Sequence, residues 1–164
     1  MFPSTLCLTK FFLIAICLCL FIHITPNGAT ATTQIHNIAY VASICNANVL
    51  VFDTSTNTIV DTVSVGISPR IVAVSPNGKR VYVSNGGSHT VSVIDAATHT
   101  VVSTIPVAQS PYGLAVTPDG SRVYVASVSG TISVIDTNSN SVVATIPDSV
   151  ESFQVAITPD GNRA

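Results

Sequence analysis

The chain has 164 residues, of which 47% are hydrophobic and 9% charged, and its formal net charge is −2. Six Lys and Arg residues give no basic stripe of the kind that nucleic-acid-binding domains carry, and this hydrophobic content excludes a disordered tail. Because Val, Thr and Ser predominate and Glu151 is the only glutamate, the composition favours β-structure over helices.

The first 31 residues have the pattern of a secretory signal peptide. Lys10 precedes an apolar run over residues 11–24, and residues 29–31 (Ala-Thr-Ala) offer small side chains for cleavage. The run is shorter than the roughly 20 residues that a membrane span needs. We therefore expect an apolar signal helix within residues 1–31 and a secreted or cell-surface protein; an uncleaved membrane anchor and a buried helix are the alternatives.

Cleavage of this signal would remove Cys7, Cys17 and Cys19 and leave Cys45 alone. A single cysteine cannot form an internal disulfide, so no disulfide framework is expected. Cys45 is predicted to be a small, partly buried hydrophobic residue at the end of a strand. A reactive thiol or an intermolecular bridge is the alternative.

The rest of the chain repeats with a period near 42 residues. Tyr40, Tyr82 and Tyr124 lie in the same Tyr-Val pattern, 42 residues apart each time. Two further motifs recur in the same order: strand ends at Asp53, Asp95 and Asp136, and Pro-(Asn/Asp)-Gly turns that begin at Pro76, Pro118 and Pro159. The shared order and register indicate a true internal repeat.

Each unit reads as four short, β-branched strands separated by turn residues. The first unit begins at its second strand, and the middle unit covers residues 69–107. Strands are expected at 38–43, 48–53, 57–65, 111–117, 122–127, 131–136, 141–146 and, opening a further unit, 152–157. Several strands are apolar on both faces, which predicts sheets that pack against neighbouring sheets.

Four strands in a unit of about 42 residues are typical of a β-propeller blade. The Tyr-Val-(Ser/Ala)-(Asn/Ser) strand, the Val-Ile-Asp strand end and the Pro-(Asn/Asp)-Gly turn resemble the YVTN-type β-propeller repeat, over about residues 38–164. The resemblance implies an all-β fold with about three blades of four antiparallel strands in residues 32–164. The blade units are about 38–65, 69–107, 111–146 and an incomplete 152–164.

A ring of the usual four to eight blades needs roughly 170 residues at the least, more than residues 32–164 supply. Two explanations stay open. The chain is a fragment of a longer propeller, or it is a short chain that closes by association, so that two copies give six blades. Its last strand could also complete the first blade. Bare blade faces predict that residues 32–164 are poorly soluble or self-associate, which size-exclusion chromatography would show.

No motif for catalysis, phosphate binding or metal binding is found in the sequence. His89 and His99 do not recur in the next unit and are predicted as turn residues rather than metal ligands. The recurring aspartates are expected to cap turns through their own backbone. Arg80, Arg122 and Arg163 are expected to brace turns, with an anion-binding ring as the alternative. We expect no catalytic residue, no metal and no cofactor.

Positions that vary between units are better candidates for a binding site. Arg70, Tyr112 and Phe153 occupy one equivalent position at the start of the inner strands, near the mouth of the predicted channel. Asn85 and Ser127 follow the second strands, on loops that the family topology places on the same face. A cation and two aromatic rings at one level predict a small ligand-binding surface. Ordinary packing of the entry loops is the alternative.

Two functions of different classes follow from these observations. The first is a secreted or cell-surface propeller that binds a protein or surface ligand without catalysis, with no nucleic-acid partner and no membrane contact beyond an uncleaved anchor. The second is part of an extracytoplasmic propeller enzyme, because the family's relatives include lactonase-like propellers and the propeller subunits of quinoprotein dehydrogenases. The largely apolar inner strands weigh against the enzyme.

Overall fold

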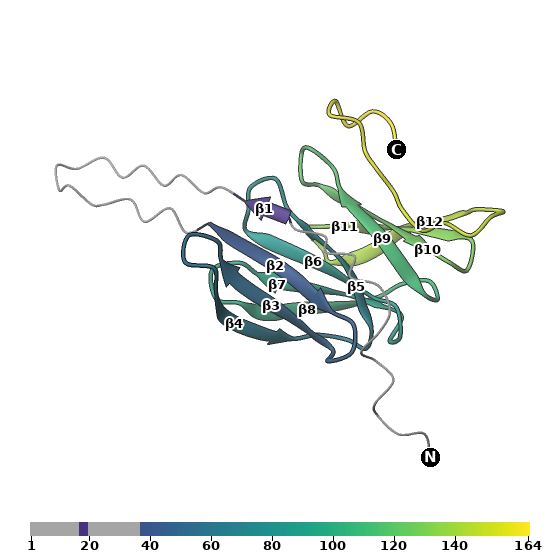
Figure 1. The fold of residues 1–164 in the computed structure, drawn as a ribbon. Helices are drawn as coiled ribbons and strands as arrows, with labels where there is room; N and C mark the ends of the chain where they lie inside the picture. Colours follow the sequence, from purple (N-terminus) through teal and green to yellow (C-terminus); the bar gives the residue numbers. More distant parts are fainter. Residues whose placement is uncertain (1–16, 20–36) are drawn as a thin grey trace, which may run out of the picture.

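The computed structural model describes residues 17–19 and 37–164, and within these residues all regular structure is β-strand (Figure 1). The strands are β1 (Cys17–Cys19), β2 (Ile38–Ser43), β3 (Asn48–Asp53), β4 (Thr58–Ser64), β5 (Pro69–Val74), β6 (Arg80–Asn85), β7 (Thr90–Asp95), β8 (Thr100–Pro106), β9 (Pro111–Val116), β10 (Arg122–Ser127), β11 (Thr131–Asp136) and β12 (Ser141–Pro147). Residues 17–19, predicted as part of the apolar signal helix, form strand β1 instead, and the rest of the predicted helix lies outside the described residues.

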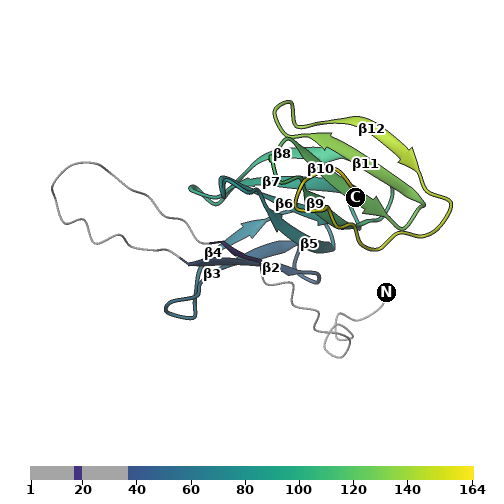
Figure 2. The same ribbon diagram turned by 90° about the horizontal axis from the view of Figure 1, so that it is seen from above.

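The strands form three antiparallel sheets of four, each built in chain order: β1 to β4, β5 to β8 and β9 to β12. The sheets stack face to face in the same order (Figure 2). The inner strands β5 and β9 pack closely, whereas the outer strands β4, β8 and β12 diverge. This fan of sheets is an open arc of propeller blades, so the all-β propeller prediction is confirmed.

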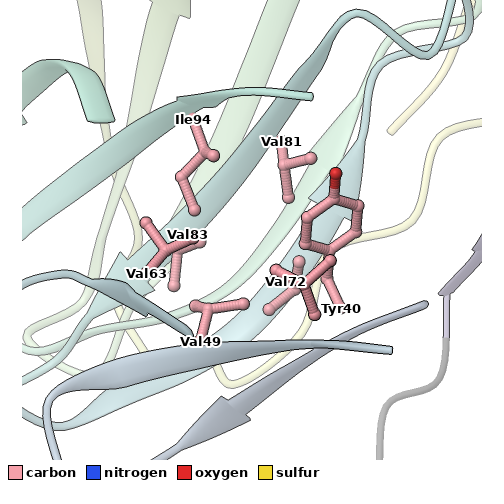
Figure 3. Packing of buried hydrophobic residues seen from close by; sticks show 8 residues of the cluster. Tyr40, Val49, Val63, Val72, Val81, Val83 and Ile94 are labelled. Carbon is pink, nitrogen blue, oxygen red and sulfur yellow. The ribbon is translucent and has the colours of Figure 1, made fainter. Parts of the chain in front are cut away.

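Two apolar layers hold the three sheets together. The layer between the first and second sheets contains the buried side chains of Tyr40, Val49, Val51, Val63, Val72, Val81, Val83 and Ile94 (Figure 3). The layer between the second and third sheets contains Tyr82, Val91, Val93, Ile105, Leu114, Val123, Val125 and Ile135. Each fully buried side chain of this size stabilises the fold by roughly 1.5–3 kcal/mol. The strands β6 and β7 of the middle sheet are therefore buried on both faces, which explains why apolar side chains point to both of their faces, whereas the outer strand β8 is mostly exposed.

The two ends of the stack carry different connections. At one end, here called the loop face, the second strands end and the inner strands begin, because Asn85 pairs with Pro69 and Ser127 with Pro111. The opposite end, here called the turn face, carries the Pro-(Asn/Asp)-Gly turns and the turns between third and fourth strands. Arg70, Tyr112 and Phe153 all lie at the loop face.

The first sheet is completed by a segment that the sequence did not predict as a strand. β1 pairs antiparallel with β2, with Leu18 opposite Ala39, and takes the place that β5 and β9 hold in their sheets. The expectation that the last strand completes this blade is therefore not what the structure shows. Unpaired backbone groups along the edge of β2 explain why an extended apolar segment can add there.

Residues 152–157, predicted as a strand, are not part of a sheet. They lie beside β9 instead, where a Cβ added to Gly113 would be 2.6 Å from the carbonyl oxygen of Phe153. Among the described residues no strand forms a hydrogen-bond ladder with this segment. Its turn nevertheless closes as in the other units, with the Thr158 amide donating to the Arg163 carbonyl at 2.9 Å.

The prediction for Cys45 was wrong. The structure places Cys45 in a disulfide and exposes it at the loop between β2 and β3. Its partner is not among the side chains that the structure describes. The prediction rests on removal of Cys7, Cys17 and Cys19 with the signal, whereas the full chain contains all three.

Candidate functional site

Loops on the loop face place the start of each inner strand. Ser68 and Ser110 have positive φ angles of 53° and 54°, and each precedes the proline that opens β5 or β9. The amide of Gly86 donates to the Ser68 carbonyl at 2.9 Å, and the amide of Val128 donates to the Ser110 carbonyl at 3.1 Å. These bonds tie each inner strand to the loop that follows the second strand of its own sheet, and they fix Arg70 and Tyr112 two residues further along the chain.

The structure brings Arg70, Tyr112 and Phe153 together. The guanidinium carbon of Arg70 lies 5.4 Å from the centre of the Tyr112 ring, within the range of a cation–π contact. The Phe153 ring meets the same ring edge-on, with centres 5.6 Å apart and planes at 80°. Arg70 and Tyr112 are partly exposed and Phe153 is 50% exposed, so the three side chains form a surface.

Ser84 positions Tyr112 from the neighbouring sheet. Its hydroxyl donates to the Tyr112 carbonyl at 2.6 Å and accepts from the Ile71 amide at 3.1 Å, so it links β5, β6 and β9. The equivalent positions in the other units are Ala42 and Ala126, which cannot make these bonds. Sequence reasoning missed Ser84, although its variation between units was the signal used for the other candidates.

Asn85 and Ser127 lie at the same end of the stack but not on its surface. They are the last residues of β6 and β10, and both have an exposed fraction of 0%. Asn85 donates to the hydroxyl of Thr90 at 3.1 Å and to that of Ser92 at 2.9 Å. These contacts assign Asn85 to the packing of the middle sheet, and neither residue joins the Arg70 surface.

Gly86 and Gly87 provide the backbone surface on which the Arg70 and Ile67 side chains pack, and sequence reasoning missed them as well. A Cβ on Gly86 would lie 3.1 Å from Arg70 Nε, and one on Gly87 would lie 2.8 Å from Ile67 Cγ2. The side chains of Arg70 and Ile67 therefore rest directly on glycine backbone. The glycine pair does not recur, because the first and third units have Ile44-Cys45 and Val128-Ser129 at these positions. This variation between units was a signal in the sequence that could have identified Gly86 and Gly87 as site residues.

The recurring aspartates cap turns on the turn face, as predicted. Each accepts at Oδ1 from the amide two residues on: Asp53 from Ser55 at 2.8 Å, Asp95 from Ala97 at 2.9 Å and Asp136 from Asn138 at 3.1 Å. Arg80 forms an ion pair with Asp95, and Arg122 forms one with Asp136 at 3.0 Å. Backbone hydrogen bonds, chiefly from Ala97 and Ser139, lower the pKa of Asp95 and of Asp136. The paired arginines thus brace the turns.

Both histidines are turn residues, as predicted. His89 and His99 have positive φ angles of 56° and 53°, and the equivalent positions hold Gly130 and Asn140 with φ of 74° and 49°. His89 Nδ1 accepts from the Ser110 amide at 3.1 Å, and His99 Nδ1 lies 3.1 Å from Asp61 Oδ2. In the part of the chain that the structure describes, no three His, Cys, Asp or Glu residues are placed to hold a metal ion.

Asp119 makes the stability of the fold depend on pH. Its carboxylate accepts from the Thr117 hydroxyl at 2.5 Å and from the amide and hydroxyl of Ser121 at 3.0 and 2.7 Å, and these bonds lower its pKa from 3.8 to about 2. A carboxyl with a lowered pKa in the folded state stabilises the fold above its unfolded pKa, and this contribution is lost as pH falls toward 2. Asn77 holds the equivalent turn without a charge, accepting from Ser75 and Lys79.

We therefore expect Asp119→Asn to keep the fold and to make the melting temperature fall less steeply between pH 4 and pH 2, as thermal unfolding followed by circular dichroism would show. Asn77→Asp is the reciprocal variant and should steepen the same decline. An unchanged slope in both variants would contradict this account of the turns.

Comparisons with known proteins agree with this architecture. The sequence model of the YNCE-like beta-propeller family matches residues 22–116 and, a second time, residues 81–163. No curated protein matches the chain. Among solved structures, the chain is similar to hydrazine synthase of Kuenenia stuttgartiensis, with a TM-score of 0.74 and 32% identity over 76% of this chain; it spans 36% of that protein's chain. The first match alone covers more than half of the sequence, and the chain belongs to the YNCE-like beta-propeller family.

Proposed function

We propose that this chain is an exported, non-catalytic propeller module that binds a partner on its loop face, through Arg70, Tyr112 and Phe153. One observation carries the proposal. These three residues hold one equivalent position in consecutive units, and they touch in series at the surface: Arg70 lies over the Tyr112 ring, and Tyr112 meets Phe153 edge-on. The rings offer apolar area and the guanidinium offers directed donors, which together make a small recognition surface.

The proposal extends to the kind of repeat and to the destination of the protein. The Tyr-Val strands around Tyr82 and Tyr124 support assignment of the blades to the YVTN type. Lys10, followed by a short apolar run and by Ala-Thr-Ala at residues 29–31, supports export to the cell exterior or the cell surface, as part of a longer propeller. Within the described residues, none of the structure is a helix with the length and apolarity to cross a membrane.

A propeller enzyme is the second candidate function. Its support is the likeness to a protein named hydrazine synthase, of which this chain spans 36%.

Selection from a random peptide library displayed on phage tests the binding proposal without assuming a ligand. The bait is the full chain, and enriched peptides are then compared on the double variant Arg70→Gln/Phe153→Ser. We expect enriched peptides to bind the double variant at least about tenfold more weakly, because Arg and aromatic anchors dominate recognition surfaces.

Lys79→Gln/Thr104→Ser is the matched control, since it removes one cation at the turn face and alters one exposed residue of the outer strand β8, three strands away from β5 and Arg70. The control should bind like the unaltered chain. Peptides that bind the double variant as tightly as the unaltered chain would refute the proposed site.

A further inference from the structure

The loop face and the turn face differ in charge. Among the described Lys and Arg residues, Arg70 is the only one on the loop face; the others, Lys79, Arg80, Arg122 and Arg163, lie in or beside turns of the turn face. Arg80 and Arg122 are paired with carboxylates, whereas Arg70 has no ion pair with any described residue. The loop face thus presents one cation that forms no ion pair with a described carboxylate.

Exposed apolar side chains gather on the same face. The loops there carry Ile44, Ile67, Val150 and Phe153, with exposed fractions of 47%, 63%, 63% and 50%. The remaining large exposed apolar residues lie on the outer strands β4, β8 and β12, and none of those described lies in a turn of the turn face. Surface clusters of apolar residues with a polar rim are typical of interaction sites.

Six residues form a continuous surface, here called the loop-face strip. They are the side chains of Ile67, Arg70, Tyr112 and Phe153 and the two glycines Gly86 and Gly87. Ile67 rests on Gly87, Arg70 rests on Gly86 and stacks over Tyr112, and Tyr112 meets Phe153 edge-on. The strip therefore runs from the loop before β5, across the middle sheet, to the segment beyond β12. Its order is apolar, cationic, aromatic, aromatic.

The chemistry of the strip selects its ligand. The fork of guanidinium donors matches the two oxygens of a carboxylate, and stacking on Tyr112 leaves the edge of the guanidinium available for that contact. Ile67 on one side and the rings of Tyr112 and Phe153 on the other favour apolar or aromatic neighbours of the carboxylate. An extended peptide presents such a sequence of groups along one line.

The acidic residues of the loop face limit how many carboxylates the ligand can carry. Asp148 and Glu151 precede Phe153, and Asp148 already accepts a hydrogen bond from the Ser152 hydroxyl. Glu151 is exposed, so a strongly acidic ligand would meet like charge at this end of the strip. A ligand with a single carboxylate next to Arg70 meets less of that repulsion than one with several.

We infer that the loop-face strip binds an extended protein segment in which one Asp or Glu side chain is flanked by aromatic or branched apolar side chains. The inference rests on the proposed binding function and adds the class of partner. The carboxylate pairs with Arg70, and the flanking apolar groups pack on Ile67, Tyr112 and Phe153.

Two fluorescein-labelled heptapeptides, GSFDFSG and GSFNFSG, test the inference by fluorescence anisotropy with the full chain. The Asp peptide should bind about three- to tenfold tighter than the Asn peptide, as expected for a partly exposed charge-assisted pair. In Arg70→Gln the two peptides should bind alike. In Tyr112→Ser both should weaken while the preference for Asp remains.

Lys79→Gln removes the same charge at the turn face and should keep the full preference for Asp. Circular dichroism spectra of all variants check that the sheets are intact. Equal binding of the two peptides to the unaltered chain, a preference that survives in Arg70→Gln, or no binding at millimolar peptide would each overturn the inference. If the phage library yields peptides that depend on Arg70 and Phe153 but lack an acidic residue, the binding function stands and the acidic partner is refuted.

Discussion

Replacing Tyr82 with alanine is expected to lower the free energy of unfolding by about 3–5 kcal/mol, the usual cost of removing a buried aromatic side chain. Tyr82 is 1% exposed and fills the apolar layer between the second and third sheets, next to Val91 and Val93. Tyr124 holds the same position in the third sheet but is only partly buried, because no described sheet covers that face. Tyr124→Ala should therefore cost about 1 kcal/mol, near the centre of the range for single substitutions.

Urea unfolding at low micromolar protein concentration measures both costs. Tyr124 thus serves as an internal control of the same residue type at the equivalent position of the repeat. A similar loss for the two variants would show that the outer face of the third sheet is covered in solution, and the open arc of blades would be the wrong description of the chain.

The same comparison at higher concentration tests self-association through the blade faces, which we propose for this chain. Ile146 is 44% exposed on the third sheet, whereas its equivalent Ile105 is 2% exposed beneath that sheet. The first sheet presents Val41 and Phe52 at positions where the second and third sheets present buried apolar residues, so a second copy can supply the missing face. If it does, the cost of Tyr124→Ala should rise with protein concentration, because association stabilises the folded chain by mass action.

The repeat made the strands predictable from sequence to within one or two residues. The predicted strands at 38–43, 48–53, 122–127 and 131–136 coincide with β2, β3, β10 and β11. Turn residues marked both ends of each strand, and three copies in one register fixed the ends more firmly than a single copy could. The roles of the turn aspartates were also predictable, because an Asx-type hydrogen bond involves only residues close in sequence.

What sequence could not supply depends on contacts between units. Asn85 ends a strand before a glycine pair, and this pattern indicates an exposed loop. The structure buries Asn85 instead, because the loop before β5 folds over it. A Cβ on Gly66 of that loop would lie 2.7 Å from Asn85 Cγ. Residues 152–157 match a strand by pattern, yet a strand needs a hydrogen-bonded neighbour and the described chain places none there. The equivalence of Arg70, Tyr112 and Phe153 was visible in the repeat, whereas their stacking order and the role of Ser84 required the structure.

Gly113→Val is expected to move the Phe153 ring away from the Tyr112 ring. A Cβ at residue 113 would lie 2.6 Å from the Phe153 carbonyl oxygen and 2.7 Å from Gln154 Cα, distances that backbone atoms cannot relieve without moving. The segment that carries Phe153 must therefore shift away from β9 and from Tyr112. Overpacking of this kind typically costs about 1–3 kcal/mol, and Gly113→Ala should give a smaller change in the same direction.

Nuclear Overhauser contacts between the Tyr112 and Phe153 rings give a direct measurement, since the rings are in edge contact in the unaltered chain and should lose that contact in Gly113→Val. Thr104→Val places the same side chain at an exposed position of β8 and should leave both the ring contact and the unfolding free energy unchanged.

The residue equivalent to Gly113 in the second unit is Ile71, so the glycine is required by the close approach of residues 152–157 and not by the repeat itself. Ring contacts that persist in Gly113→Val would mean that this segment does not rest against β9 in solution, and the aromatic pair would then have to be held together by another element.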